Sequence, residues 1–498
     1  MTKASLTIDP AFAIADVDPR LFGSFVEHLG RCVYTGIYEP GHPAADENGF
    51  RRDVLDLVRE LGVTVVRYPG GNFVSGYRWE DGVGPDRPTR LDSAWRSIEP
   101  NTFGLGEFIK WTRAAGVEPM MAVNLGTRGV QEAIDLLEYA NHPSGTHWSD
   151  LRRKHGDAEP YDIRLWCLGN EMDGPWQLGH KTADEYGRLA AETARAMRMI
   201  DRRLELVACG SSGATMPTFG TWEATVLKHA YDVVDYVSLH AYYEPIDGDV
   251  ATFLASGDRM EAFIADTVAT CDHMRAVTRS TKRINLSFDE WNVWYMRKFQ
   301  AQESTLEWRH APPLLEDHYD VTDAVVVGSL LIALLRHADR VRVACQAQLV
   351  NVIAPIFAEP GGPAWRQTIF HPFAQASRYG RGRVLRVEPQ TPVYECAAGE
   401  VGLLHATAVQ AEDGTVTLFA VNRSQTDALE LAANVRALGD GVRVLEHTVL
   451  TDEDLGARNS AAEPDRVRPR PVTGTGIDTG TLHASLPPVS WNVIRLGR

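Results

Sequence analysis

Two acidic segments far apart in the sequence each end an apolar run. Glu171 follows the apolar residues 165–168 in Gly169-Asn170-Glu171, and Glu290 follows a second apolar run in Asp289-Glu290-Trp291-Asn292. A carboxylate at the end of a buried strand is held on a rigid support. Glycoside hydrolysis needs two carboxyl groups, because the glycosidic oxygen must be protonated while the anomeric carbon is stabilised from the other side. Glu171 and Glu290 are therefore our candidate pair, and the alternative for Glu171 is that it only caps the next turn.

Apolar, strand-like runs alternate with amphipathic helical patterns through the first two thirds of the chain. Residues 51–61 and 182–200 are two of the predicted helices. Eight strands with helices between them are the count of a (β/α)8 barrel, and a doubly wound open sheet is the alternative. We expect a TIM barrel over residues 16–384. Its predicted strands are 22–26, 64–67, 120–124, 164–170, 204–209, 236–240, 284–289 and 341–346.

Nearly every predicted strand ends in a side chain that can form hydrogen bonds or titrate. Barrel enzymes build their active sites at the C-terminal ends of the strands. In a closed barrel Glu171 and Glu290 would therefore reach the same mouth. The polar ends are Glu27-His28, Arg67-Tyr68, Asn124, Asn170-Glu171, Ser211-Ser212, His240 with Tyr242, Asp289-Glu290 and Gln346 with Gln348.

The pattern changes after residue 385, where helical periodicity gives way to alternating strand-like runs. We expect residues 1–15 and 385–498 to form an all-β, jelly-roll-like sandwich in which the N-terminal run 4–8 pairs with the C-terminal strands. Residues 451–480 are rich in Gly, Pro, Arg and Asp and are predicted to be a long surface excursion. The other predicted strands of this domain are 402–409, 415–421, 442–450 and 491–496.

The charge balance excludes some classes of partner. The formal net charge is −16 at pH 7, and both a nucleic-acid backbone and an anionic membrane surface require a basic patch. We therefore expect no nucleic-acid and no membrane partner. The apolar run 324–335 is too short to span a bilayer and is predicted to be a buried helix.

The sequence also favours a reducing compartment. Its first residues lack the apolar stretch and cleavage site of a secretory signal. The six cysteines are scattered singly along the chain, as expected for reduced, buried thiols. We expect a cytoplasmic protein.

Five motifs spread over almost the whole chain carry a family resemblance. Together they resemble the α-L-arabinofuranosidases of glycoside hydrolase family 51, and motifs this long and dispersed are highly specific. They are Gly23-Ser24-Phe25-Val26-Glu27-His28, Arg67-Tyr68-Pro69-Gly70-Gly71-Asn72-Phe73, Trp166-Cys167-Leu168-Gly169-Asn170-Glu171-Met172-Asp173-Gly174, Asp289-Glu290-Trp291-Asn292 and Gln348-Leu349-Val350-Asn351.

The resemblance implies a retaining, two-step reaction with no metal and no organic cofactor, in which Glu171 is the acid/base and Glu290 the nucleophile. Their carboxyl groups should then lie about 5–5.5 Å apart, whereas about 6.5–9.5 Å would indicate inversion. We expect Glu290 to stay ionised if a cation such as Arg67 lies close, and Glu171 to keep its proton in a less polar setting. The resemblance also suggests a homo-oligomer, often a hexamer.

Further site residues follow from the same resemblance. Glu27, Asn72, Asn170 and Gln348 match residues that form hydrogen bonds with the furanose hydroxyls. Tyr242 matches a tyrosine beside the nucleophile, and Trp95 and Trp176 match aromatics that line the pocket and its leaving-group side. Arg67 is placed behind the nucleophile, where it would balance its charge, and His240 is included among the residues around the substrate.

Several of these residues have a purely structural alternative. Glu27 could be the ion-pair partner of a nearby His or Arg, Asn72 a turn residue with positive φ, and Gln348 a satisfied core amide. His240 is favoured as a hydrogen-bonded structural histidine over a metal ligand, because no second His or Cys stands at metal spacing. Trp95 and Trp176 lie in polar loops, which favours a pocket wall over core packing.

The predicted substrate is a terminal, non-reducing α-L-arabinofuranosyl residue of an arabinan- or arabinoxylan-derived oligosaccharide. Two alternatives remain. One is a β-xylosidase or endo-β-glucanase on the same scaffold, and the loop at residues 244–249 leaves the accepted leaving group open. The other is a non-catalytic carbohydrate-binding barrel, against which the presence of both Glu171 and Glu290 argues.

Overall fold

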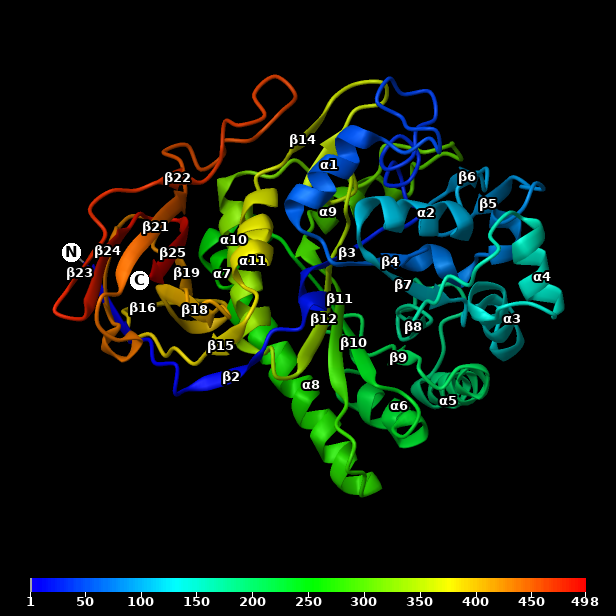
Figure 1. Cartoon of the computed structure of the whole chain (residues 1–498), viewed down its shortest axis with the longest axis horizontal. Helices are drawn as coiled ribbons and strands as arrows, with labels where there is room; N and C mark the ends of the chain where they lie inside the picture. Colours follow the sequence, from blue (N-terminus) through cyan, green and yellow to red (C-terminus); the bar gives the residue numbers. More distant parts are fainter. Residues whose placement is uncertain (1) are drawn as a thin grey trace.

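Eight parallel strands close into a barrel in the computed structural model, which describes residues 2–498 (Figure 1). Around the barrel the strands follow the order β10-β11-β12-β3-β4-β7-β8-β9. Every predicted barrel strand overlaps one of them, so the (β/α)8 prediction is confirmed and the open sheet is excluded. In chain order they are β3 (Gly23–Phe25), β4 (Val65–Tyr68), β7 (Glu118–Val123), β8 (Leu165–Leu168), β9 (Glu205–Ala208), β10 (Tyr236–Tyr243), β11 (Asn285–Val293) and β12 (Val341–Gln346).

Helices surround the barrel, and two of them show how local sequence sets their ends. α1 ends at Leu61 because Gly62 takes up the left-handed conformation (φ +78°). α5 begins after Thr182, whose side chain forms a capping box with Glu185. The helices are α1 (Arg52–Leu61), α2 (Leu105–Ala115), α3 (Val130–Asn141), α4 (His147–Lys154), α5 (Ala183–Ile200), α6 (Thr221–Ala230), α7 (Val250–Leu254), α8 (Ser256–Thr278), α9 (Met296–Glu303), α10 (Val321–Arg336) and α11 (Phe370–Tyr379).

Two sheets stack beside the barrel and enclose a second apolar core (Figure 1, left). One has the order β2-β15-β18-β19-β25-β21-β22 and the other β1-β20-β24-β23. The predicted all-β domain is therefore present. Its strands are β1 (Thr2–Thr7), β2 (Ala13–Asp16), β15 (Arg383–Leu385), β18 (Leu404–Gln410), β19 (Val416–Asn422), β20 (Leu429–Asn434), β21 (Arg443–Leu450), β22 (Arg470–Pro471), β23 (Gly476–Asp478), β24 (Thr481–Leu486) and β25 (Ser490–Gly497).

The N-terminal strand belongs to this sandwich, as predicted. β1 runs parallel to β20, with Thr2 opposite Leu429 and Thr7 opposite Asn434. The predicted boundaries at residues 16 and 384 fall inside β2 and β15, which pair with each other. The division of the chain at those two positions stays a prediction. The segment 451–480 is mostly exposed loop, as predicted for a surface excursion, and Ala457, Asn459 and Val467 in it are buried.

Helix α10 lies between the barrel and the sandwich (Figure 1). All of its residues except Thr322 and Arg336 are buried, which explains its continuous apolar sequence and confirms the predicted buried helix. A Cβ on Gly328 would lie 2.4 Å from the ring of Trp491, so glycine lets α10 approach the sandwich closely. In the described part of the chain, no helix has both the length and the apolar composition needed to cross a bilayer.

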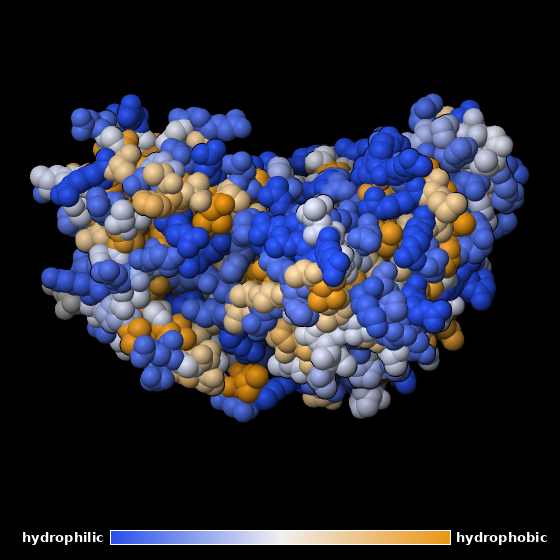
Figure 2. All heavy atoms as spheres, turned by 90° about the horizontal axis from the view of Figure 1, so that it is seen from below, coloured by the Kyte–Doolittle hydropathy of each residue, from blue (hydrophilic) through white to orange (hydrophobic). Residues whose placement is uncertain are grey.

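The outer surface is mostly polar. The face in Figure 2 is largely hydrophilic, and apolar residues are interspersed among the charged ones. This agrees with an ordinary globular composition.

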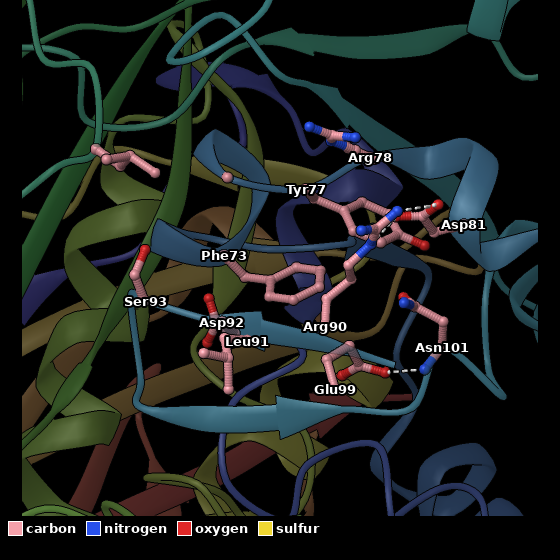
Figure 3. A pocket seen from close by; sticks show the side chains of 12 residues that line it. Phe73, Tyr77, Arg78, Asp81, Arg90, Leu91, Asp92, Ser93, Glu99 and Asn101 are labelled. Carbon is pink, nitrogen blue, oxygen red and sulfur yellow. Dashed lines mark hydrogen bonds and ion pairs between the residues drawn. The ribbon is translucent and has the colours of Figure 1, made fainter. Parts of the chain in front are cut away.

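The structure also contains several short strands and 3₁₀ helices. After β4 comes a hairpin formed by β5 (Arg90–Asp92) and β6 (Ser97–Glu99) (Figure 3), and Trp95 in its turn reaches Glu27 at the C-terminal end of β3. The remaining short elements are η1 (Pro19–Phe22), η2 (Asn72–Ser75), η3 (Trp79–Gly82), η4 (Ile246–Gly248), η5 (Arg436–Leu438), β13 (Ile356–Ala358), β14 (Ala364–Arg366), β16 (Val393–Cys396) and β17 (Gly399–Gly402).

Candidate active site

The two predicted catalytic carboxyl groups meet at the mouth of the barrel. Glu171 follows β8 with a left-handed backbone (φ +43°), and Glu290 lies within β11. One carboxyl oxygen of each lies within 4.8 Å of the other. Both side chains are buried at the base of the mouth. Positive φ at a non-glycine residue costs energy and is found most often at functional sites.

Glu290 accepts a hydrogen bond on each of its oxygens. Arg67 Nη1 donates to Oε1 over 2.7 Å, and the Tyr242 hydroxyl donates to Oε2 over 2.7 Å. Burial raises the pKa of Glu290, and the nearby charges of His240 and Arg67 oppose that rise. The predicted placement of Arg67 and Tyr242 next to Glu290 is thus found in the structure.

His240 connects the two carboxyl groups to a third. Its Nδ1 lies 2.8 Å from Glu171 Oε1 and 3.5 Å from Glu290 Oε2, and its Nε2 lies 2.8 Å from Asp289 Oδ1. Burial alone would lower the pKa of His240, but the neighbouring carboxylates of Glu290, Asp289 and Glu171 raise it to about 10. His240 is therefore an imidazolium at neutral pH that donates from both ring nitrogens. The expected less polar setting of Glu171 is wrong, since this cation lies against it.

Sequence reasoning did not include Asp289 among the site residues. Asp289 is buried, and burial would raise its pKa, but Arg67 and His240 lower it instead. In a regular strand consecutive side chains point to opposite faces, so Asp289 would point away from Glu290. The strand is irregular here: the three residues from Ser238 to His240 of β10 lie opposite the four residues from Ser287 to Glu290 of β11. This extra residue is a β-bulge, and it lets both carboxylates reach His240.

The same cluster offers three possible metal-ligand atoms, from Glu171, His240 and Glu290. A metal ion needs a neutral imidazole with a free lone pair. His240 uses both nitrogens as donors to carboxylates and is protonated at neutral pH. The donor set therefore does not fit a resident metal ion.

Glu27, at the C-terminal end of β3, has neutral hydrogen-bond donors around it. Its Oε1 accepts from Phe73 N and from Trp95 Nε1, both at 2.9 Å, and its Oε2 accepts from Gln348 Nε2 at 3.0 Å. Burial raises the pKa of Glu27 to about 8. These contacts come from a backbone amide, an indole and a side-chain amide, so Glu27 does not form the alternative ion pair with a nearby His or Arg.

Two glycines make room for the Glu27 carboxyl group. A Cβ on Gly70 would lie 2.8 Å from Glu27 Cγ, and a Cβ on Gly71 would lie 2.5 Å from Glu27 Oε2. Asn72 follows as the first residue of η2 and is half-buried. It is not among the described residues with positive φ, so the alternative of a left-handed turn residue does not apply.

Two buried amides in the site have a free polar atom. Asn170 Oδ1 accepts from Arg67 Nη2 at 2.6 Å, but Asn170 Nδ2 has no partner among the described residues. Gln348 donates to Glu27, but its Oε1 likewise has no partner in residues 2–498. The alternative of a satisfied core amide is therefore wrong for Gln348. Buried polar atoms are almost always paired, so unpaired ones beside two candidate catalytic groups indicate a missing polar partner.

The two predicted tryptophans occupy different surroundings. Trp176 is 52 % exposed and its Nε1 donates to Glu171 Oε2 over 2.7 Å, so it lies at the outer rim. Trp95 is only 8 % exposed and packs edge-on against Phe299. Its indole points inward to Glu27, which places it in the inner wall.

The hairpin that carries Trp95 forms hydrogen bonds with the long loop after α9. Ile98 N donates to the Arg309 carbonyl oxygen over 2.8 Å, and Arg96 Nη1 donates to the Leu306 carbonyl oxygen over 3.2 Å. The barrel mouth is thus partly covered at this side. No periodicity in these two loops predicted that they would meet.

Comparison with known proteins agrees with this geometry. Two family models match, described as Alpha-L-arabinofuranosidase 1 domain (residues 57–258) and Alpha-L-arabinofuranosidase C-terminal domain (residues 289–490). An intracellular exo-alpha-(1->5)-L-arabinofuranosidase of Streptomyces lividans is 67 % identical over 99 % of this chain and 75 % of its own length. A protein of the same name from Acetivibrio thermocellus is 55 % identical over 100 % of both chains. An exo-alpha-(1->6)-L-arabinofuranosidase of Bifidobacterium longum is 53 % identical, covering 100 % of this chain and 98 % of that one.

A solved structure gives the same result for the fold. A family 51 alpha-L-arabinofuranosidase from Bifidobacterium longum superposes with a TM-score of 0.97 at 49 % identity, over 100 % of both chains. The sequence relatives and the fold thus agree over the whole length, and the family models agree over residues 57–258 and 289–490. The chain belongs to the α-L-arabinofuranosidases of glycoside hydrolase family 51.

Proposed function

We propose that the protein is an exo-acting, retaining α-L-arabinofuranosidase that removes terminal, non-reducing α-L-arabinofuranosyl residues from arabino-oligosaccharides. The observation that carries this proposal is the approach of Glu171 and Glu290, with one oxygen of each within 4.8 Å of the other. Inverting enzymes keep their carboxyl groups about 6.5–9.5 Å apart so that a water fits between them. The shorter separation supports direct attack by one carboxylate.

In the first step the Glu290 carboxylate attacks C1 of the arabinofuranosyl unit. The bond from C1 to the leaving oxygen breaks, and that oxygen takes the Glu171 proton. In the second step Glu171, now a carboxylate, takes a proton from a water whose oxygen attacks C1, and the bond to Glu290 breaks. Two inversions at C1 leave the released sugar with its original anomeric configuration.

The charges around the pair support this assignment. Arg67 and His240 bring two cations to the three carboxyl groups of Glu171, Asp289 and Glu290. A buried excess of negative charge is costly, and these two cations oppose the rise that burial causes in the pKa of Glu290. Glu290 accepts from Arg67 and from Tyr242, and these donors favour its ionised form, as a nucleophile requires.

The remaining predicted residues suit a small polyhydroxylated ring. Asn170 Nδ2 and Gln348 Oε1 supply an unused donor and an unused acceptor, Glu27 accepts from Gln348, and we assign Asn72 to the same sugar from the family resemblance. The hairpin that carries Trp95 covers one side of the mouth, which supports removal of a terminal unit. The relatives provide no support for the xylosidase, endoglucanase or non-catalytic alternatives.

Other parts of the proposal rest on the relatives and on the family. Several relatives carry the name intracellular exo-alpha-(1->5)-L-arabinofuranosidase, so we propose a cytoplasmic enzyme that cleaves α-(1→5) bonds. A homo-oligomer and a reaction without cofactor stay predictions of the family resemblance.

Substrate choice tests the proposed function. We expect nitrophenyl α-L-arabinofuranoside to be cleaved with a kcat/KM at least roughly 100-fold above that of nitrophenyl β-D-xyloside, because buried polar groups placed for one sugar are left unpaired by another. Linear arabinan should release arabinose only. Failure to cleave the arabinofuranoside, or release of mid-sized oligosaccharides from arabinan, would reject the proposal.

Replacement of Glu171 tests the acid/base role. Glu171→Ala should lower kcat/KM by roughly 100- to 10,000-fold for sugar leaving groups, which need the proton, and far less for dinitrophenolate, which does not. Azide should restore turnover and yield the α-arabinofuranosyl azide, because a small anion fits where the carboxyl group was. The rate of phenolate release is measured for each substrate, and NMR identifies the anomeric configuration of the arabinofuranosyl azide. Equal losses on both leaving groups would contradict the role.

Asp289 acts through His240, and this predicts a change in the pH profile. Asp289→Asn removes a negative charge that raises the pKa of His240, so the imidazolium loses its proton at a lower pH. A neutral imidazole cannot donate to both neighbours, and the alkaline limb of kcat/KM should move to lower pH by about one unit or more. Profiles from pH 5 to 10 on nitrophenyl arabinofuranoside measure this. Asp317→Asn, another buried aspartate outside this cluster, is the control; an unmoved limb in Asp289→Asn would refute the coupling.

A further inference from the structure

Asn292 is a buried residue to which the proposed mechanism gives no task. It lies in β11, two positions after Glu290, and it has no exposed surface. The neighbouring barrel strand is β12, and the loop that follows β12 begins at Ala347 and carries Gln348 (Figure 1). A side-chain amide has two donor hydrogens and one acceptor oxygen, and a buried one is almost always paired. The partners of Asn292 therefore show what it holds.

The Asn292 amide bonds to both ends of the loop 347–353. Its Nδ2 donates to the Ala347 carbonyl oxygen over 2.6 Å and to the Ile353 carbonyl oxygen over 2.5 Å. Its Oδ1 accepts from Gln346 Nε2 at 3.2 Å and from Val293 N at 2.9 Å. Both donor hydrogens and the acceptor oxygen are thus used within the protein, and the side chain closes this loop against β11.

One of these bonds fixes the backbone beside Gln348. The Ala347 carbonyl belongs to the peptide unit that leads into Gln348, and a peptide unit is planar. The bond from Asn292 therefore sets the direction in which the Gln348 side chain leaves the backbone. The preceding peptide unit is held by the same strand, because Ala347 N donates to the Trp291 carbonyl oxygen over 3.1 Å.

Gln348 belongs to the group of residues around the proposed sugar position. It is 2 % exposed, and its Nε2 donates to Glu27 Oε2 over 3.0 Å. Glu290 and Asn292 lie in one strand, so β11 carries the nucleophile and, two positions later, the amide that holds the loop of Gln348. The position of Gln348 relative to the nucleophile is therefore set through Asn292.

We propose that Asn292 is a positioning residue for the bound sugar, because it holds the loop after β12 so that Gln348 meets the furanose ring in a fixed place relative to Glu290. The inference rests on the proposed arabinofuranosidase function and deepens it. Asn292 has no exposed surface, so it acts on the sugar only through Gln348.

Removal of the Asn292 amide tests this role. Asn292→Ala should raise the KM for nitrophenyl α-L-arabinofuranoside by roughly 3- to 10-fold, the worth of one hydrogen bond to the sugar. We expect kcat to change less than KM, because Gln348 is assigned to the ring hydroxyls and not to the reacting atoms. A variant that is only less stable would contain less active enzyme, which lowers kcat and leaves KM unchanged.

A double-mutant cycle identifies the residue through which Asn292 acts. In Gln348→Ala the side chain that Asn292 positions is absent, so the additional change Asn292→Ala should raise KM by less than about twofold. Initial rates over a range of substrate concentrations give KM for the parent, the two single variants and the double variant. The same factor in both backgrounds would overturn the proposal, because independent sites multiply their effects.

Asn422 provides a matched control at the end of β19 in the sandwich. It has no exposed surface either, and its Nδ2 donates to the carbonyl oxygens of Asp427, Leu486 and Pro487. Asn422→Ala removes the same kind of buried amide from the other domain. Its thermal stability should fall as that of Asn292→Ala does, and its KM should equal that of the parent.

A second variant keeps the test open if Asn292→Ala does not fold. Asn292→Ser retains one donor hydrogen, and its KM should lie between those of the parent and Asn292→Ala. An unchanged KM in a folded Asn292 variant, or an equal rise of KM in Asn422→Ala, would overturn the proposal. A parent enzyme that does not cleave nitrophenyl arabinofuranoside would instead reject the arabinofuranosidase function itself, so the two failures are distinguishable.

Discussion

Two buried cations hold three carboxyl groups together at the mouth of the barrel, and the rest of the site depends on this balance. Arg67 contacts Glu290, and His240 bridges Glu171 and Asp289. Without the cations, three buried carboxylates this close would repel one another and take up protons. With them, two positive charges face the three carboxyl groups, so most of the negative charge is balanced. The barrel serves this cluster by ending β4, β8, β10 and β11 at one mouth.

Local irregularities of the backbone make the cluster possible. The bulge in β11 turns two consecutive acidic residues toward His240, and the left-handed backbone of Glu171 directs its side chain across the mouth. After β4, Gly70 and Gly71 leave the space that the Glu27 carboxyl group fills. Such features cost stability and persist where the surrounding fold enforces them. Regular strands would have delivered the same residues to the wrong faces.

Much of this arrangement could be predicted from the sequence, because it depends on local periodicity. The barrel strands are short apolar runs followed by polar residues, so their number and their C-terminal ends could be predicted. Glu171, Glu290, Arg67 and Tyr242 could be assigned to one mouth for that reason. The pairing of β1 with the C-terminal strands could be predicted, since the first residues alternate as a strand does, but its parallel partner β20 could not.

The rest depends on contacts between distant segments. The role of Asp289 follows from a bulge that leaves no mark in the sequence, and the charged surroundings of Glu171 follow from His240 on another strand. The burial of Trp95 requires a hairpin and a distant loop to meet through Ile98 and Arg309. Residues 451–480 have a loop composition, yet Val467 is buried, because tertiary packing overrides composition.

The most direct measurement of the account is capture of the covalent sugar. The enzyme is incubated with a fluorinated arabinofuranoside that carries a good leaving group, so that formation of the sugar ester outpaces its hydrolysis, and the digested protein is analysed by mass spectrometry. If Glu290 is the nucleophile, one added mass of the fluorinated arabinofuranosyl group should appear on the peptide that contains Glu290, at that side chain. A sugar found on Glu171, or turnover without any labelled peptide, would contradict it.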